Sequence, residues 1–278
     1  TWEAGANEFR GDAGPVGTRR SGFNDRIVES FFAAVAAAGH PTTEDYNGAQ
    51  QEGIGTLQLT VRHGRRCSTA TAYLRPALHR DNLVVHVNAR ATRILFDRTR
   101  AIGIEYQQAG ETRSAMAERE VLLTSGVINT PQLLMLSGIG PPDQLRAHEL
   151  DIRVPLPGVG ANLQDHLTVN VEYRRRDFGL LHRHMRLDRT VASLAQACLF
   201  RTGIWGELPS GWTGFFKTRP ELAMPDVQFL FRALPSNAGP YLSPFRKPYA
   251  DGFAVRAVML RPQSRGTVSL TSADPSKP

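Results

Sequence analysis

The chain has 278 residues, of which 41% are apolar, enough for one or two domains that each bury a core. Its two cysteines, Cys67 and Cys198, lack Cys-x-x-Cys spacing, so the sequence indicates neither a disulfide scaffold nor a cysteine metal site. The net charge is +7, but the one compact basic run is residues 174–176, and no nucleic-acid-binding pattern accompanies it. We therefore expect a solvated basic surface and no nucleic-acid partner, with peripheral membrane contact left open.

The first part of the chain predicts a surface segment followed by one helix. Residues 1–22 are rich in Gly, Arg and Asp without periodicity, which is typical of an extended surface segment. Asn24 or Asp25 suits the N-cap of a helix whose apolar residues recur at helical spacing over residues 27–35. Residues 42–66 are rich in Gly, Gln and other polar residues and predict an irregular stretch.

A strand, a glycine turn and a helix are predicted at the centre of the chain. Residues 121–123 form a short apolar run that is typical of a buried parallel strand, and Ser125 with Gly126 turns the chain sharply at its carboxyl end. The Thr-Pro pair at 130–131 suits a helix cap and first helical position, and Ser-Gly-Ile-Gly at 137–140 ends the helix. The carboxyl ends of such strands are where α/β sheets bind cofactors.

The other periodic segments predict strands and one further helix. Residues 83–106 predict two strands that flank a polar turn. Beyond residue 174, we expect a second, antiparallel layer with a helix over 188–200 and strands over 227–232, 253–261 and 267–271.

Residues 124–140 resemble the second signature of the glucose-methanol-choline (GMC) oxidoreductases, a family of FAD-dependent alcohol oxidases and dehydrogenases. Val127 departs from the family's preference for Ala, Ser, Thr or Pro, so the turn is more crowded here. Further stretches that resemble the family are residues 65–78, 82–85, 156–166 and 264–275. Within the family, the Gln-Gln-Glu-Gly run at residues 50–53 and the stretch at 162–166 are most similar to bacterial choline and long-chain alcohol dehydrogenases. The positions that comply with the signature are Gly126, Thr130, Pro131, Leu133, Leu134, Ser137, Gly138, Ile139 and Gly140.

This resemblance implies two parts of a larger fold. Residues 46–166 would form part of an FAD-binding domain of the Rossmann-like α/β type, and residues 167–278 part of an α+β substrate domain with an antiparallel sheet. Residues 1–45 would be the surface segment and helix that join the domains. The glycine-rich phosphate loop and the His-Pro-x-Gly segment of the family are absent from the sequence. We therefore expect a piece of a longer protein, whose catalytic base lies beyond residue 278.

The resemblance also implies the chemistry. The intact protein would oxidise a small-molecule alcohol to an aldehyde or ketone with FAD as cofactor, and would pass the electrons to oxygen or a quinone-type acceptor. Ala91 takes the place of a family Val whose main chain meets the adenine, and a backbone contact tolerates Ala. The residues expected near the cofactor are Ala91, Ser125, Gly126, Asn162, Asp165 and His166.

Asp165 and His166 form an adjacent acid and imidazole pair, but neighbouring residues on a strand point to opposite faces. A structural or cofactor-side role is therefore favoured over a catalytic dyad. The spacing of the histidines, His182-x-His184 included, predicts no metal site.

Two alternatives to the redox enzyme stay open: an FAD-containing hydroxynitrile lyase, and a non-catalytic fragment that does not hold FAD. The longest apolar stretches, residues 31–38 and 191–200, fall short of a membrane span. We therefore expect a cytoplasmic protein, with membrane association left open.

Overall fold

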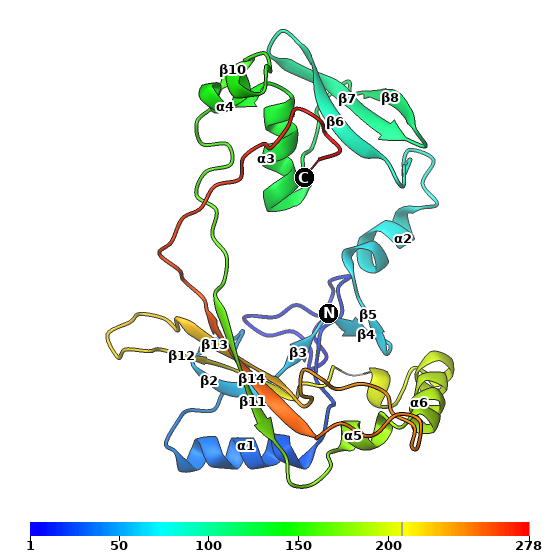
Figure 1. Cartoon of the computed structure of the whole chain (residues 1–278), viewed down its shortest axis with the longest axis vertical. Coiled ribbons are helices and arrows are strands. Elements are labelled where there is room, and N and C mark those ends of the chain that lie inside the picture. Colours follow the sequence, from blue (N-terminus) through cyan, green and yellow to red (C-terminus); the bar gives the residue numbers. More distant parts are fainter. Residues whose placement is uncertain (207, 278) are drawn as a thin grey trace. The chain divides into compact units, whose positions relative to one another are not determined.

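The computed structural model describes residues 1–206 and 208–277, and contacts group them into two units (Figure 1). The sheet unit comprises residues 1–83 and 166–262, and the α3 unit comprises residues 84–165 and the chain from residue 263 onward. These units differ from the division expected from sequence, because residues 46–83 lie with the sheet and the chain from residue 263 lies with α3. The functional assignment of the two parts stays a prediction.

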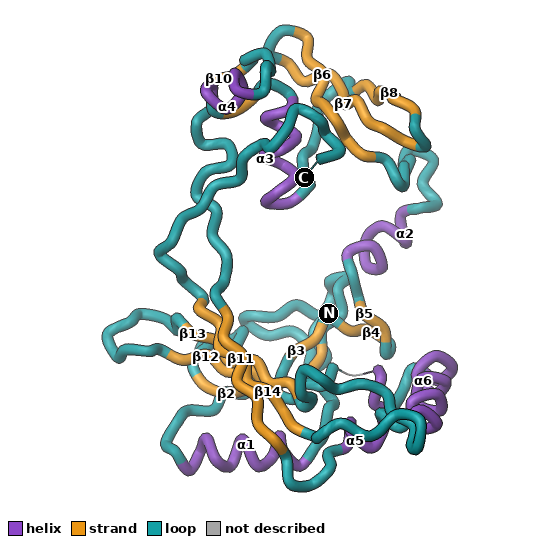
Figure 2. The backbone as a smooth tube through the Cα atoms, in the orientation of Figure 1, coloured by secondary structure: helices purple, strands orange, loops and turns teal. Residues whose placement is uncertain are grey.

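A five-stranded antiparallel sheet, in the order β11-β14-β13-β12-β2, is the centre of the sheet unit (Figure 2). Helix α1 (Arg26–Ala37) packs its apolar stripe on one face of this sheet, where the Phe31 ring stacks on Trp212 at a centroid distance of 4.1 Å. The strands are β2 (Gly53–Thr56), β11 (Thr168–Arg174), β12 (Trp212–Phe216), β13 (Val227–Arg232) and β14 (Gly252–Met259). The expected antiparallel layer is thus confirmed for β13 and β14.

Helix α1 begins where the sequence predicts. Asp25 has an extended backbone, and its Oδ1 accepts the Ile27 N–H at 3.0 Å, which satisfies one of the free donors of the first turn. The same buried carboxylate pairs with Arg175 at 2.9 Å and accepts the Leu180 N–H at 3.0 Å. Asp25 therefore joins the start of α1 to the segment that follows β11.

The remaining elements of the sheet unit are short. Strand β1 (Arg19–Arg20) pairs with β3 (Gln58–Leu59), and β4 (Val61–Arg62) pairs with β5 (Arg65–Arg66). The helical segments are η1 (Ala70–Leu74), α2 (Arg75–Ala77), α5 (Leu180–His184), α6 (Leu187–Phe200) and η2 (Ile204–Gly206). The helix predicted over 188–200 is confirmed as α6.

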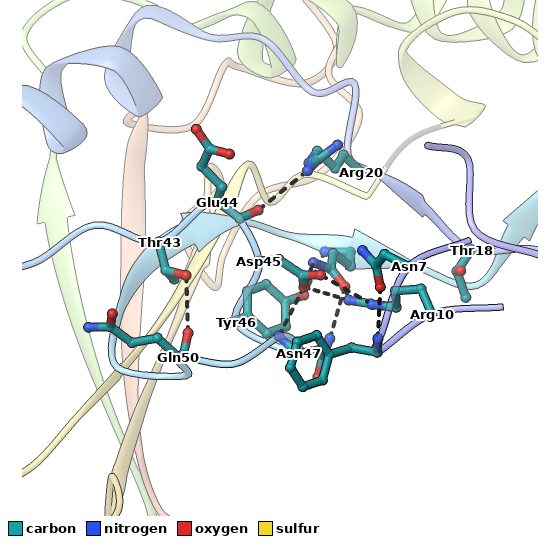
Figure 3. Close-up of polar contacts among 12 residues, drawn as sticks. Asn7, Arg10, Thr18, Arg20, Thr43, Glu44, Asp45, Tyr46, Asn47 and Gln50 are labelled. Atoms are coloured by element: carbon teal, nitrogen blue, oxygen red, sulfur yellow. Dashed lines mark hydrogen bonds and ion pairs between the residues drawn. The ribbon is translucent and has the colours of Figure 1, made fainter. Parts of the chain in front are cut away.

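The prediction of an irregular stretch over residues 42–66 is wrong, because this stretch contains β2, β3, β4 and β5. A polar network orders its first half (Figure 3). Arg10 pairs with Asp45 at 2.6 Å, Gln58 Nε2 donates to Asp45 Oδ1 at 2.8 Å, and the Tyr46 hydroxyl accepts the Gln58 N–H at 2.7 Å. The partners lie 35 residues apart for Arg10 and Asp45, so local patterns do not reveal them.

The α3 unit is built from a three-stranded antiparallel meander and one main helix. Strands β6 (Arg90–Asp97) and β7 (Arg100–Gln108) flank the polar turn that the sequence predicts, and β8 (Glu111–Met116) pairs with β7. Helix α3 (Gly126–Leu136) contacts β6. The smaller elements are β9 (Ile139–Gly140), which pairs in parallel with β10 (Val154–Pro155), and α4 (Pro142–Ala147).

Three local predictions for the α3 unit are wrong. Residues 121–123 are not a strand, because no strand of the described chain pairs with them, and a parallel strand needs such a neighbour. Helix α3 already begins at Gly126, so Pro131 lies inside it rather than at its first position. Residues 267–271 form no strand, since the Val268 N–H donates to the Gly160 carbonyl instead of joining a ladder.

Candidate functional site

Helix α3 is held in place by a buried serine at its carboxyl end. Ser137 donates its hydroxyl hydrogen to the Leu133 carbonyl at 2.6 Å and accepts the Ile94 N–H of β6 at 2.9 Å. Met135 is fully buried against Leu145 in the core of this unit. One face of the helix is therefore fixed to the meander and to the core, and this fixes its amino end relative to β6.

A cavity of about 480 Å³, here called the α3 cavity, opens between β6 and one side of α3, from Ser125 before the helix to Leu136 at its end. This volume lies within the roughly 300–1,000 Å³ typical of small-molecule sites. Ala91 and Ser125, both predicted from sequence, line it together although 34 residues separate them by number (125 minus 91). The full lining is Arg90, Ala91, Ser125, Asn129, Gln132, Leu133, Leu136, Pro275, Ser276 and Lys277.

Gly126 follows Ser125 at the first position of α3 and has φ +85°, a backbone conformation that favours glycine. A Cβ added to this residue would meet no heavy atom within 4 Å, so the space beside its main chain is open. The first N–H groups of a helix have no carbonyl partner within the helix, and the Ser125 side chain caps none of them. An exposed main chain with free donors suits a phosphate or another anion.

The chain from Pro275 to Lys277 forms one wall of the α3 cavity. Gln132 Nε2 donates to the Lys277 carbonyl at 2.9 Å, which ties this segment to α3. Hydrogen bonds from the Ser276 hydroxyl and N–H hold the pKa of Asp274 below its usual value, and the charges of Lys277 and Arg90 act in the same direction. The cavity is thus lined by two cationic side chains and several amide and hydroxyl groups.

Asn162 lies on another side of α3. It lines a second cavity of about 470 Å³ together with Val127, Pro131 and the glycine segment of residues 158–160. The backbone of Asn162 is left-handed, with φ +60°, which Asn tolerates better than most residues. Of the expected cofactor residues, the structure therefore brings Ala91 and Ser125 to one cavity, with Gly126 beside them, and places Asn162 at the other.

Asp165 and His166 are exposed residues of an extended stretch outside regular structure, and neither lines either cavity. Each makes an interaction of its own, so neither is a free side chain. Because they are not in a strand, the argument from alternating strand faces does not apply to them. The structure brings neither of them to the α3 cavity.

Sequence reasoning missed most of the polar groups in the α3 cavity. Asn129 and Gln132 lie four and seven residues after Ser125, so in a helix that begins at Gly126 they share one face with it. The predicted helix start at Pro131 leaves Asn129 outside the helix, so the sequence analysis does not identify this face. Arg90 and Lys277 carry no local signal, because long-range packing brings them together.

The sheet unit holds an apolar cavity of about 680 Å³ between α1 and the sheet. Phe31, Trp212, Phe216 and Phe229 line it, and Lys217 and Glu52 form an ion pair of 3.3 Å among the lining residues. Trp212 is fully buried against Phe31, so the aromatic side chains of β12 serve the core as well as the cavity.

The described residues hold neither a metal cluster nor a membrane-spanning helix. Among the described residues, no group of three or more His, Cys, Asp or Glu side chains could hold a metal ion. In the same part of the chain, no helix has the length and apolar character needed to cross a bilayer.

Comparisons with known proteins agree on one family. The family model described as GMC oxidoreductase matches residues 15–168. The mitochondrial choline dehydrogenase of Mus musculus is 41% identical over 280 residues, which cover 98% of this chain and 45% of that protein. The oxygen-dependent choline dehydrogenase of a Rhizobium etli strain is 37% identical, over 98% of this chain and 48% of that protein. The chain thus spans about half the length of the curated relatives it matches.

Solved structures agree with the sequence relatives. A variant formate oxidase of Aspergillus oryzae, solved to study FAD modification, superposes with a TM-score of 0.83 at 25% identity and covers 96% of this chain and 51% of that one. A pyridoxine 4-oxidase from Mesorbium loti has a TM-score of 0.77 at 22% identity, over 98% of this chain and 49% of its own, and supports the fold alone.

Proposed function

Because this chain belongs to the GMC oxidoreductase family, we propose that the intact protein is an FAD-dependent enzyme that oxidises an alcohol to an aldehyde or ketone. The observation that carries the proposal is the convergence of Ala91 and Ser125 on one cavity beside the amino end of α3. These two positions, 34 residues apart by number, are two of the six that the resemblance places near the cofactor.

The residues of the α3 cavity fit part of a dinucleotide. The open main chain at Gly126 leaves room for close approach, and the free N–H groups of the first turn of α3 suit an anionic oxygen. Arg90 and Lys277 add positive charge, and the side-chain amides of Asn129 and Gln132 add donors and acceptors. These groups would hold and orient the nucleotide portion of FAD. When bound, FAD supplies the acceptor for the hydride of the alcohol carbon.

The names of the relatives suggest which alcohol and which electron acceptor to test for this protein. Choline is the first substrate to test, because relatives at 37–41% identity are named choline dehydrogenases. Oxygen and a quinone-type compound stay the two candidate acceptors. Peripheral membrane contact also stays a proposal.

The cofactor is tested on the product of the complete reading frame. We expect a yellow protein that releases FAD on heat denaturation. Ala91→Trp should fill the α3 cavity and weaken FAD binding roughly tenfold or more, equivalent to about 1.4 kcal/mol. Ala91→Val is the matched control, because it keeps the main-chain contact and introduces the residue that the family pattern carries. Equal FAD affinity in the two variants would place the nucleotide elsewhere.

The reaction is tested by adding choline, and then other primary and secondary alcohols, without oxygen. An alcohol dehydrogenase or oxidase bleaches its flavin absorbance when a substrate is added. A hydroxynitrile lyase keeps the oxidised spectrum and instead releases cyanide from a cyanohydrin. Bound FAD with cyanide release and no bleaching would therefore refute alcohol oxidation while leaving the cofactor assignment intact.

A further inference from the structure

Strand β6 contains one extra residue beside the α3 cavity. Ala91 lies opposite Tyr106 of β7, but Arg93, two residues later, lies opposite Glu105, the neighbour of Tyr106. Thr92 is therefore left without an opposite residue, as in a β-bulge. A bulge bends its strand and redirects the side chains next to it, and Ala91, which directly precedes this one, lines the cavity.

The side chain of the extra residue holds the bulge in place. Thr92 is 6% exposed, and its hydroxyl oxygen lies 2.9 Å from Glu105 Oε1 and 3.2 Å from the Glu105 carbonyl oxygen. The single hydroxyl hydrogen is donated between these two acceptors on β7. Because a buried hydroxyl without an acceptor is costly, these contacts fix Thr92 in the bulged position.

Helix α3 fixes the other end of the same stretch of β6. The Ile94 N–H donates to the buried Ser137 Oγ at 2.9 Å, next to the regular pair of Arg93 and Glu105. With Ile94 held in this way, the place of Ala91 depends on the bulge between them. Without the bulge, the pairing ahead of Arg93 would shift by one residue, and the Ala91 side chain would turn to the other face of the meander.

We infer that Thr92 is a positioning residue for the cofactor, which acts through the β6 bulge without touching FAD itself. Thr92 is absent from the lining of the α3 cavity, whereas Ala91 belongs to it. This role rests on the proposed function and adds to it the interaction that holds the Ala91 main chain in place for the nucleotide. Every contact involved lies within the α3 unit.

A second irregularity in the meander provides a comparison. Between Leu95 and Phe96 the pairing shifts again, and here the extra residue, Ile102, belongs to β7. Neither Leu95 nor Phe96 lines the α3 cavity. Of these two irregularities, the bulge at Thr92 is thus the one that adjoins a residue expected near the cofactor.

The test uses the complete gene product, prepared free of flavin and titrated with FAD. Thr92→Val keeps the shape of the side chain but removes the hydroxyl, and should weaken FAD binding roughly fivefold or more. Thr92→Ser keeps the hydroxyl and loses a methyl group, so it should bind FAD like the unmodified protein even where its stability falls. Thr112→Val is the matched control, because Thr112 is exposed on β8 and does not line the cavity, and should leave FAD binding unchanged.

Urea denaturation of the flavin-free proteins separates positioning from folding. Equal FAD affinity of the folded Thr92→Val and Thr92→Ser variants, whatever their stabilities, is the result of a purely structural role. It would overturn the inference and leave the proposed function standing. A complete protein that binds no FAD would overturn both.

Hydrogen exchange tests the bulge without the cofactor. The amides of residues 90–94 should exchange faster in flavin-free Thr92→Val than in Thr92→Ser, because the hydroxyl no longer ties β6 to β7. Equal exchange in the two variants would show that the hydroxyl does not hold the bulge, and would overturn the inference independently of FAD.

Discussion

Alanine at Gly126 and alanine at Gly138 have different expected effects, although both glycines belong to the same signature. Their φ angles are nearly equal, +85° and +83°. A left-handed backbone costs an alanine about 1–2 kcal/mol at either position. At Gly126 an added Cβ meets open space, whereas at Gly138 it overlaps the Asp151 carbonyl oxygen and lies 3.2 Å from the Arg153 Cβ.

The overlap at Gly138 adds a packing penalty that Gly126 does not have, typically about 1–3 kcal/mol. Gly138→Ala should therefore lower the free energy of unfolding by about 2–5 kcal/mol, and Gly126→Ala by about 1–2 kcal/mol. The loss of FAD affinity should be larger for Gly126→Ala than for Gly138→Ala. The reason is that the new methyl group at residue 126 takes up the open space beside the start of α3. Gly138→Ala should leave the FAD affinity of the folded protein close to that of the unmodified one.

Urea denaturation followed by far-ultraviolet circular dichroism measures the first effect, provided that the m-value is unchanged. Titration of flavin-free protein with FAD measures the second. Equal losses of stability in the two variants would refute the packing argument. Unchanged FAD affinity in Gly126→Ala would refute the role of the α3 amino end in holding the cofactor.

Two further predictions concern buried polar groups. Asp25→Asn keeps the cap of α1 but leaves the Arg175 cation unpaired, which should cost about 3–5 kcal/mol near neutral pH in urea denaturation. Burial raises the pKa of Asp25, but hydrogen bonds from Arg175 and two N–H groups together outweigh it and lower the pKa. The stabilisation by Asp25 is therefore present above about pH 4 and lost as pH falls through the lower folded value. The pH dependence of the unmodified protein should therefore be steeper below pH 4 than that of the variant, and parallel curves would contradict this. Ser137→Ala removes the acceptor of the buried Ile94 N–H and should cost about 1–3 kcal/mol, whereas Ser137→Thr should recover part of the loss.

The sequence correctly predicts helix and strand ends that are set by residues at the end itself, such as a capping side chain or a polar turn. Asp25 caps α1, and the polar turn between β6 and β7 lies where the sequence indicates. The start of α3 was mistaken, because a Thr-Pro pair is a frequent helix start and Gly126 in a left-handed conformation gives no such signal. Strand β2 was missed because its hydrogen bonds come from β12, more than 150 residues later.

The candidate site could be predicted in part. Ala91 and Ser125 were identified from the family pattern, and the structure adds that they line one cavity. Asn129 and Gln132 became visible only with the correct start of α3. Lys277 reaches the cavity through its carbonyl contact with Gln132, a tertiary interaction between residues 145 positions apart.

Cys198 gives the chain a built-in reporter. Cys67 is buried and Cys198 is exposed on α6, so a maleimide dye should label the second thiol selectively among the residues from 1 to 277. A solvatochromic label at that position would register whether its surroundings lose water when the protein meets another macromolecule. The emission shift would follow such an encounter in real time and without any engineered substitution.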